Sequence, residues 1–282
     1  MWPLDAELGE GPCWVDDRLW FVDILGQRIH CLEPDSGHTK SWPAPGRVSF
    51  VLPAEAGRFV VGLPGSLHRF DPSNGSFSLL VRFEADFPHN RTNDACVAPD
   101  GALWFGTLDQ RETHPSGHLY RWDGVASAPA ARDQGYVISN GPAFSPEGDI
   151  LYHTDTLQRT VYAFDVGRGG LLSRKRAHIQ VEDGAGWPDG TTVDAAGCLW
   201  IALWNGGAVR RYSSTGILLG EMCLPCARVT KVAFGGAGLQ TLFVTTARTG
   251  LVAGEIARAP LSGGVFRIPV EVPGLPQARL RF

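Results

Sequence analysis

Three observations predict an all-β chain. Glycine and proline make up about a fifth of the 282 residues, beside 9 Trp and 14 Phe, as expected for tight turns between aromatic strands. A short aromatic strand pattern recurs six times along the chain, and a second, alternating pattern follows each copy. Together they predict a six-bladed β-propeller with four-stranded antiparallel blades around a central channel.

The first pattern is an apolar strand with an aromatic residue near its centre, as in RLWFVD at 18–23 and ALWFGT at 102–107. Its six aromatic markers are Trp20, Phe59, Trp104, Tyr152, Trp200 and Phe243. The markers are 39, 45, 48, 48 and 43 residues apart. Repeats of this length, each holding several short strands, are typical of propeller blades.

The second pattern alternates apolar and polar residues, as in LHRFD at 67–71 and VRRY at 209–212, and predicts half-buried strands. Turn sequences such as PDG at 99–101 separate the strands. The first and last units resemble the middle ones, which favours a closed ring over the alternative, a solenoid with atypical ends. We expect one domain over 1–282, with a single short helix at 251–257 before Pro260.

Charge and composition argue against several classes of protein. The 25 basic and 29 acidic residues are well mixed and give a net charge of −4, so no nucleic-acid partner is expected. No apolar run is long enough for a membrane span, and the N-terminus lacks the features of a signal peptide, so a cytoplasmic location is expected. Four cysteines in or beside strand-like runs, Cys13, Cys31, Cys96 and Cys198, are interpreted as small buried hydrophobic residues. The single C-x-x-C at Cys223 and Cys226 could be a redox pair or half a zinc site, but a structural role is favoured because a second cysteine pair or a histidine pair is missing.

Polar residues recur at one phase of the repeat, ten to twelve residues before each aromatic marker. They are Glu10, Ser49, Asn93 with Asp94, Asn140, Asp189 and Lys231. In a closed ring, equivalent positions of all blades point at the same level of the channel. Glu10, Asn140 and Asp189 would then offer oxygen ligands, which suit Ca²⁺, Mg²⁺ or Mn²⁺, although Zn²⁺ or Fe²⁺ could also be held. The alternative is that these residues cap turns or line a wet channel.

Several of these stretches resemble a known family. They are GEGPCW at 9–14, FVDI at 21–24, RTND at 91–94, GALWFGT at 101–107, ISNGP at 138–142 and PDG at 188–190. The chain resembles the SMP-30/gluconolactonase family, which includes regucalcin: six-bladed propellers that hydrolyse sugar lactones with one divalent metal ion. HTDT at 153–156, ALW at 202–204, TTAR at 245–248 and GGVF at 263–266 are similar to bacterial pentonolactonases, notably xylonolactonases.

The resemblance implies a site. Its metal ligands would be Glu10, Asn140 and Asp189, holding one divalent ion (Ca²⁺, Mn²⁺, Zn²⁺, Mg²⁺ or Fe²⁺). Arg91 and Asn93 would bind the substrate, and Asp94 is a further candidate for which a structural role is equally expected. A carboxylate after the Gly-Thr strand end would bind sugar hydroxyls, and here that residue is either Glu112 or Asp109.

The expected reaction is metal-dependent hydrolysis of a sugar aldonolactone, such as xylonolactone or gluconolactone, to the aldonic acid. Asp189 would act as general base as well as ligand, and Arg91 would stabilise the developing negative charge. Trp187 and Trp204 could stack on the sugar, although core packing is at least as well supported. Two alternatives stay open: a related propeller esterase or organophosphatase, and a non-catalytic calcium-binding propeller.

Other groups carry weaker predictions. His114 and His118 lie among proline and glycine and are expected in a plain surface loop, while His153 is expected to be buried and hydrogen-bonded. The expected partner is a small-molecule sugar lactone, with neither nucleic acid nor membrane. A monomer is favoured over a dimer.

Overall fold

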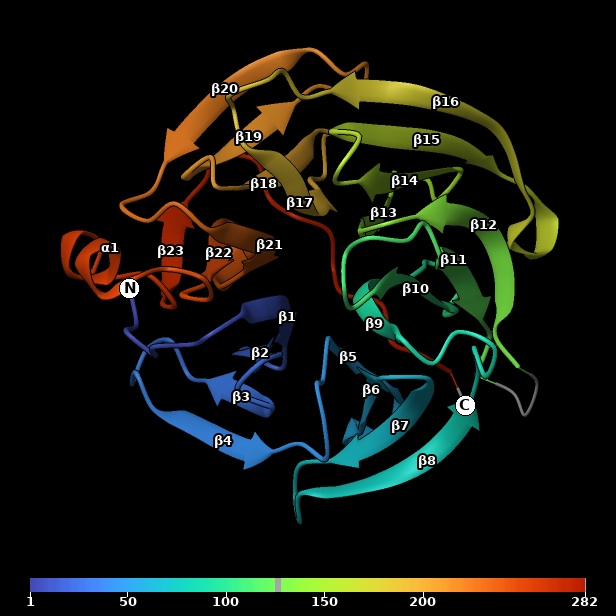
Figure 1. Cartoon of the computed structure of the whole chain (residues 1–282), viewed down its shortest axis with the longest axis horizontal. Helices are drawn as coiled ribbons and strands as arrows, with labels where there is room; N and C mark the ends of the chain where they lie inside the picture. The colour runs from blue at the N-terminus through green and yellow to red at the C-terminus, as the bar shows by residue number, and fades with distance from the viewer. Residues whose placement is uncertain (125–127, 282) are drawn as a thin grey trace.

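The computed structural model describes residues 1–124 and 128–281. Within them, six antiparallel sheets form a ring around a central channel, so the predicted six-bladed β-propeller is confirmed (Figure 1). Five sheets have four strands each, and the sixth has three. The described residues contain no helix that is long and apolar enough to cross a membrane.

The first three blades follow the chain from the channel outward. The first contains β1 (Gly9–Val15), β2 (Arg18–Asp23), β3 (Arg28–Leu32) and β4 (Thr39–Pro43). The second contains β5 (Val51–Pro53), β6 (Phe59–Leu63), β7 (Ser66–Asp71) and β8 (Ser76–Arg82), with a 3₁₀ turn at Glu55–Gly57. The third contains β9 (Asn90–Val97), β10 (Leu103–Asp109), β11 (Gly117–Trp122) and β12 (Ala130–Tyr136).

The remaining blades repeat this order. The fourth contains β13 (Ser139–Phe144), β14 (Ile150–Asp155), β15 (Thr160–Val166) and β16 (Leu172–Gln180), with a 3₁₀ turn at Arg168–Gly170. The fifth contains β17 (Trp187–Val193), β18 (Leu199–Trp204), β19 (Ala208–Tyr212) and β20 (Leu218–Cys223). The sixth contains β21 (Val229–Gly235), β22 (Thr241–Thr246) and β23 (Val265–Pro269), with a 3₁₀ turn at Ala237–Leu239.

The two sequence patterns correspond to the second and third strands of each blade. All six aromatic markers lie on second strands, where their side chains are buried between blades. Trp20, for example, packs against Phe59 of the second blade with ring centroids 4.2 Å apart. The short helix α1 (Ala253–Arg258) lies between β22 and β23, as expected for 251–257, and ends before Pro260. Burial of these strand faces against the neighbouring blades is the main stabilising contribution to the ring.

The ring is closed by the N-terminal segment. Trp2 forms a two-way backbone bridge with Val265 at the edge of the three-stranded blade, with N···O distances of 2.9 and 3.0 Å. Further in, the Thr230 hydroxyl donates to the Gly9 carbonyl oxygen at 2.6 Å, which joins β21 to β1. The sixth blade therefore acquires its outermost backbone pairing from the other end of the chain.

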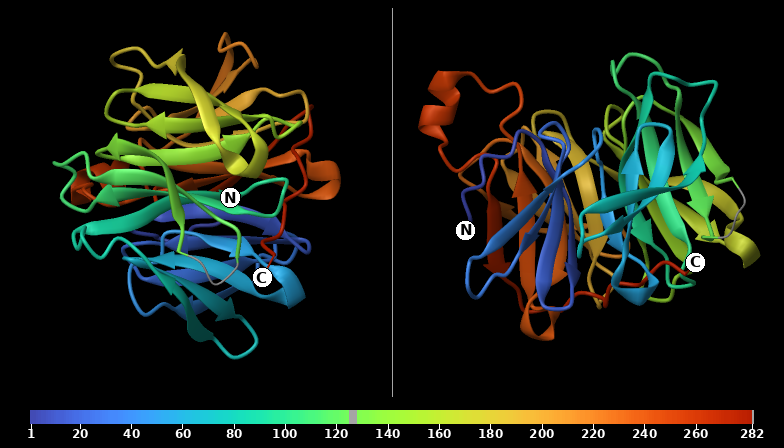
Figure 2. Two further views of the ribbon diagram at one scale, coloured as in Figure 1. Left: turned by 90° about the vertical axis from the view of Figure 1, so that its right-hand side faces the viewer. Right: turned by 90° about the horizontal axis from the view of Figure 1, so that it is seen from below.

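The C-terminal segment covers the face of the ring opposite to α1 (Figure 2). Gly274 donates its N–H to the Leu239 carbonyl oxygen at 2.9 Å in the sixth blade, and Leu280 pairs with Pro53 and Glu55 in the second. The segment therefore spans the ring and leaves the face that carries α1 as the open mouth of the channel.

Two histidine predictions need correction. His114 is exposed in a loop, as expected, but His118 lies on β11 and is half-buried, with Nδ1 3.1 Å from the Glu84 carboxylate. His153 is fully buried as predicted, yet neither ring nitrogen has a hydrogen-bond partner among the described residues. Its ring packs edge-on against Tyr136 at 4.7 Å, and burial lowers the pKa of His153 to about 3, so this histidine stays neutral.

Candidate active site

The innermost strands deliver Glu10, Asn140 and Asp189 to the channel. These residues lie on β1, β13 and β17, and each is less than a tenth exposed. In all three strands the pairing register with the next strand slips at this level, between Glu10 and Cys13 in the first blade. A bulge re-aims the side chain and locally frees the strand from the ladder, so the three oxygen-bearing groups turn toward the axis.

A glycine follows each of the three residues, and two of these glycines are required by the geometry. Gly141 has a φ of +46°, and a Cβ there would lie 2.8 Å from the Thr191 backbone nitrogen. Gly190 leaves room for the Lys231 side chain, whose Cγ would lie 2.3 Å from an added Cβ. The inner strands can therefore approach one another closely only because these positions lack side chains.

A chain of hydrogen bonds fixes the amide orientations in the site. Arg91 Nη1 donates to Asn93 Oδ1 at 2.7 Å, and Asn93 Nδ2 donates to Asn140 Oδ1 at 2.8 Å. Asn140 Nδ2 in turn donates to the Thr156 hydroxyl at 2.9 Å, which donates to the Pro188 carbonyl oxygen. Because arginine can only donate, the sequence of donors and acceptors has one direction. The Asn140 carbonyl oxygen is thereby directed to the same side as Asn93.

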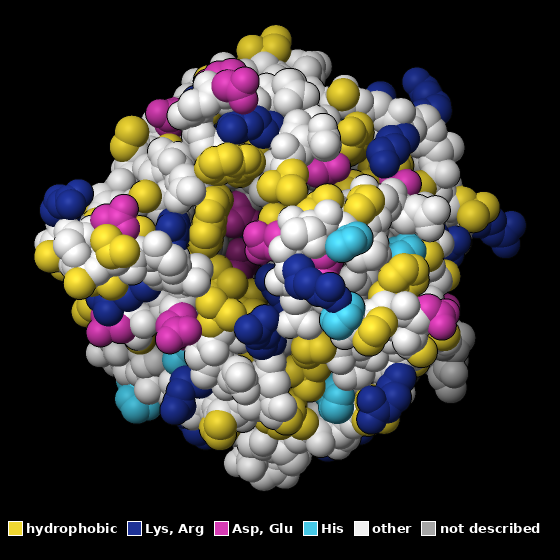
Figure 3. Space-filling model, viewed as in Figure 1, with side chains coloured by type: hydrophobic (Ala, Val, Ile, Leu, Met, Phe, Trp, Pro, Cys, Tyr) yellow, Lys and Arg dark blue, Asp and Glu magenta, His cyan; other side chains and the backbone are white. Residues whose placement is uncertain are grey.

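These groups surround a cavity of about 130 Å³ at the mouth of the channel. Its polar lining comprises Glu10, Arg91, Asn93, Glu112, Asn140, Thr156 and Asp189. Its apolar lining comprises Leu8, Ile24, Leu108, Ile138 and Trp204. Figure 3 shows acidic side chains at the bottom of a hollow near the centre of this face. A cavity of this size with convergent polar groups suits one small polar ligand.

Burial strongly perturbs the ionisation of the site. Burial, followed by repulsion from Asp94, raises the pKa of Glu10 to about 8. Burial and repulsion from Glu10 raise the pKa of Asp189 well above its ordinary value. Burial lowers the pKa of Arg91 to about 10, which leaves the guanidinium charged at neutral pH. Two buried carboxylates that disfavour each other's ionisation would be relieved by a cation between them.

The residues fit a divalent metal ion. Two carboxylates and an amide oxygen are hard oxygen ligands, and the Asp189 carboxylate accepts no hydrogen bond from any described residue. Among the described residues there is no group of three or more His, Cys, Asp and Glu side chains suited to a metal, so imidazole- or thiolate-rich sites are not found there. The remaining coordination positions would fall to water or to a ligand in the cavity.

The structure separates the substrate-binding candidates. Arg91, Asn93 and Glu112 line the cavity, whereas Asp94 and Asp109 do not. Asp109 accepts hydrogen bonds from its own loop, including the His114 backbone N–H at 3.1 Å, and so shapes the turn that presents Glu112. Of the two tryptophans, Trp204 lines the cavity, while the Trp187 ring lies under the Arg159 guanidinium at 4.7 Å.

Comparison with known proteins identifies the family. Residues 8–248 match the family described as SMP-30/Gluconolactonase/LRE-like region. The chain belongs to the SMP-30/gluconolactonase family. It is 36% identical to a 6-deoxy-6-sulfogluconolactonase of Pseudomonas putida, over 95% of this chain and 92% of the relative. It is 34% identical to an L-arabinolactonase of Azospirillum brasilense, over 96% and 91%.

A solved structure superposes closely on this SMP-30/gluconolactonase family member. The calcium-binding protein regucalcin from Agrobacterium tumefaciens strain C58 is 28% identical, with a TM-score of 0.95 over 99% of this chain and 96% of that one. The family predicted from the sequence motifs is therefore confirmed. Lactonases are among the relatives that match nearly the whole chain, which supports the predicted enzyme class.

Sequence reasoning gave no role to two groups that the structure places in or beside the site of this SMP-30 family member. Thr156 relays the hydrogen-bond chain from Asn140. Its sequence signals are its place in the HTDT stretch at 153–156 and its position two residues beyond the strand pattern of the fourth unit. Lys231 shares the phase of the ligands and forms an ion pair with Asp94 in the channel. The six cysteines are free, and the C-x-x-C pair consists of exposed Cys223 and buried Cys226.

Proposed function

We propose that the protein hydrolyses a sugar aldonolactone to the corresponding aldonic acid with the help of one divalent cation. The observation that carries this proposal is the convergence of Glu10, Asn140 and Asp189 on a small cavity that also holds Arg91 and Asn93. The relatives named as lactonases support the reaction class. A cytoplasmic location and a monomeric state stay predictions from the sequence.

The cation would be held by the two carboxylates and the Asn140 amide oxygen. When bound, it would supply a Lewis acid that polarises the lactone carbonyl group. The oxygen-only ligand set favours Ca²⁺, Mg²⁺ or Mn²⁺ among the candidates. The regucalcin structure that superposes on the chain is described as calcium-binding, which makes Ca²⁺ the first cation to test.

The other steps of the reaction would be carried out by residues that line the cavity. Asp189 takes a proton from the attacking water as its oxygen bonds to the carbonyl carbon, because a buried carboxylate with a raised pKa is an effective base once ionised. The Arg91 guanidinium stabilises the negative charge that develops on the carbonyl oxygen. The bond from the carbonyl carbon to the ring oxygen then breaks, and the ring oxygen takes the proton from Asp189 as it becomes a hydroxyl group, which leaves Asp189 ionised again.

The substrate is held by groups that suit a polyhydroxylated ring. Asn93 and Glu112 offer an amide and a carboxylate to the hydroxyl groups, and Trp204 offers an apolar face. The cavity of about 130 Å³ favours the lactone of a single pentose or hexose acid over a larger ester. Arg91 is already fixed by its bonds to Thr92 and Asn93, so its position is set before the substrate arrives.

The test combines a substrate panel with one variant. Acid release from pentono- and gluconolactones is followed in a pH-stat, with and without a chelator. We expect turnover that the chelator abolishes, and a loss of at least about 100-fold in D189N, since a general base typically contributes 10²–10⁴-fold. The matched control is D165N, because Asp165 lies on β15 and pairs with Arg174 and Arg176 away from the cavity.

A calcium-binding propeller without activity is the second candidate, and the regucalcin match favours considering it. Tight cation binding without acid release from any lactone would support it. Turnover of an aryl ester or organophosphate but of no lactone would support the esterase alternative. Near-normal lactone turnover by D189N would remove the proposed role of Asp189.

A further inference from the structure

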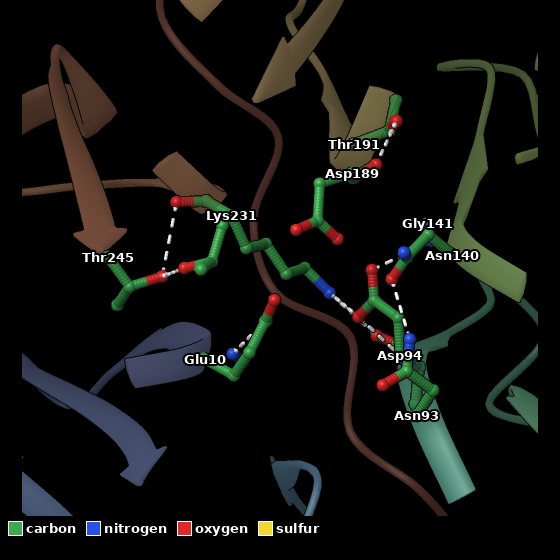
Figure 4. Close-up of polar contacts among 12 residues, drawn as sticks. Glu10, Asn93, Asp94, Asn140, Gly141, Asp189, Thr191, Lys231 and Thr245 are labelled. Carbon is green, nitrogen blue, oxygen red and sulfur yellow. Dashed lines mark hydrogen bonds and ion pairs between the residues drawn. The ribbon is translucent and has the colours of Figure 1, made fainter. Parts of the chain in front are cut away.

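Lys231 crosses the channel behind the candidate ligands. It begins on β21, its side chain is 8% exposed, and its stem passes over the bare backbone of Gly190. Its ammonium group forms an ion pair with Asp94 Oδ1 and donates to the Ala95 carbonyl oxygen at 3.2 Å. In Figure 4 the Lys231 side chain lies between those of Glu10 and Asp189 and ends at Asp94.

Asp94 connects Lys231 to the strand that carries the candidate ligand Asn140. Its Oδ2 accepts the Gly141 backbone N–H at 2.8 Å, next to the candidate ligand Asn140, and its Oδ1 also accepts the Ala95 N–H at 2.7 Å. One ion pair therefore connects β21 to β9 and, through Gly141, to β13 (Figure 4). Both Asp94 oxygens are engaged, and neither lines the cavity.

The charges around this pair are unbalanced without the lysine. Glu10, Asp94 and Asp189 are three mutually repelling carboxylates in the interior of the ring, and Lys231 attracts both Glu10 and Asp189 as well as Asp94. Arg91 is a second cation that acts on Glu10 and Asp189. If the ammonium were absent, Asp94 would become an unpaired buried carboxylate close to two others, which is the arrangement that binds a divalent cation more tightly.

We propose that Lys231 is a built-in cation of the site: its ammonium keeps Asp94 out of the ligand set and holds Asn140 and Asp189 in place before a divalent cation binds. This inference rests on the proposed cation site of the lactonase. Lys231 acts as a positioning residue through Asp94 and through its packing on Gly190, and it needs no contact with the substrate. It also restricts the site to one divalent cation with three protein ligands.

The test compares K231M with D94N/K231M. Methionine keeps an unbranched apolar stem over Gly190 but lacks the charge, and the second substitution, D94N, removes the carboxylate that the charge balances. Unfolding midpoints are measured in excess chelator, and Ca²⁺ affinity and stoichiometry are measured by calorimetry. The control is K175M, because Lys175 also pairs with an aspartate, Asp133 at 2.5 Å, but on the outer strand β16.

Two results are expected of K231M. Its cation-free midpoint falls by about 6–10 °C, since breaking a buried ion pair leaves an uncompensated charge. Its Ca²⁺ affinity rises by about tenfold or more, since a repelling charge is lost and a carboxylate is released. D94N/K231M should recover most of the midpoint and bind Ca²⁺ within a few-fold of the natural protein. K175M should leave Ca²⁺ binding unchanged.

The inference is overturned if K231M binds Ca²⁺ with unchanged or lower affinity, or if its cation-free midpoint does not fall. Should K231M not fold, the double variant decides: a midpoint near that of the natural protein supports the inference, and an equally severe loss overturns it. A natural protein that binds Ca²⁺ but hydrolyses no lactone refutes the proposed function and leaves this test intact. A natural protein that binds no divalent cation refutes both.

Discussion

Replacing Glu10 by glutamine should stabilise the cation-free protein at pH 8. The carboxyl group has an ordinary pKa of 4.5, and in the folded protein burial and repulsion from Asp94 raise its pKa to about 8. Between these values the folded protein keeps a proton that the unfolded chain has lost. Stability rises with pH only where the unfolded state holds more protons, so here it falls as the pH rises from about 4.5 to about 8.

The magnitude follows from the size of the shift. Raising the pKa of Glu10 from 4.5 to about 8 corresponds to roughly 5 kcal/mol of lost stability once the group is ionised. Glutamine cannot ionise, yet its amide oxygen can still accept the Gly11 N–H that Glu10 Oε2 accepts at 2.8 Å. E10Q should therefore unfold roughly 10 °C above the natural protein at pH 8 and near it at pH 4.5.

The assay is thermal unfolding in excess chelator at pH 4.5, 6 and 8. The control is E33Q, since Glu33 lies at the surface in a pair with Arg18 and should show no such trend. In Ca²⁺ the order at pH 8 should reverse, because E10Q lacks a ligand while the natural protein is stabilised by binding. A difference between E10Q and the natural protein that stays constant from pH 4.5 to 8 would refute the reasoning, as would a less stable E10Q at pH 8.

Two further substitutions test the geometry of the site. G141A should cost about 1–3 kcal/mol in urea unfolding, because its φ of +46° and the 2.8 Å approach of the added Cβ to the Thr191 nitrogen both oppose a side chain; an unchanged midpoint would contradict this. R91K should lower kcat/KM by about 10-fold or more while Ca²⁺ affinity stays within a few-fold, since lysine lacks the planar guanidinium whose Nη1 bonds Thr92 and Asn93 while its other nitrogens bond no described residue and stay free for the substrate. Lost Ca²⁺ binding in R91K would contradict it.

Most of the ring could be predicted because the blades repeat locally. Each marker, such as Trp20 or Trp104, occupies the second strand of its blade, and the spacing alone places the turns. Closure of the ring could not be predicted in this way, because it depends on residues that are far apart in the sequence. The backbone bridge between Trp2 and Val265 depends on the N-terminus meeting the last blade, and neither residue shows this in its local sequence. The expected fourth strand of that blade is thus reduced to a bridge.

The ligand phase could be predicted from the sequence because Glu10, Asn140 and Asp189 each lie ten to twelve residues before the aromatic marker of their unit. The sequence did not indicate which carboxylate of the 108–112 segment faces the cavity. Asp109 and Glu112 are both acidic and close in sequence, and the choice is made by the turn that follows β10. The Asp109 carboxylate accepts hydrogen bonds from backbone N–H groups of that turn. Glu112, which has a φ of +56°, lines the cavity together with Arg91.

The direction of the Lys231 side chain could not be predicted from its own strand. The repeat places its Cα at the ligand level, but a lysine at that position could extend toward the mouth of the channel or across it. The direction is decided by residues on two other blades: Gly190, which leaves space for the stem, and Asp94, which receives the charge. Because a glycine at 190 also permits the close approach of β17, one small residue serves both the ligand Asp189 and the lysine. The site is therefore specified by pairs of positions across the ring, and a substitution at Gly190 should disturb Lys231 before it disturbs the fold.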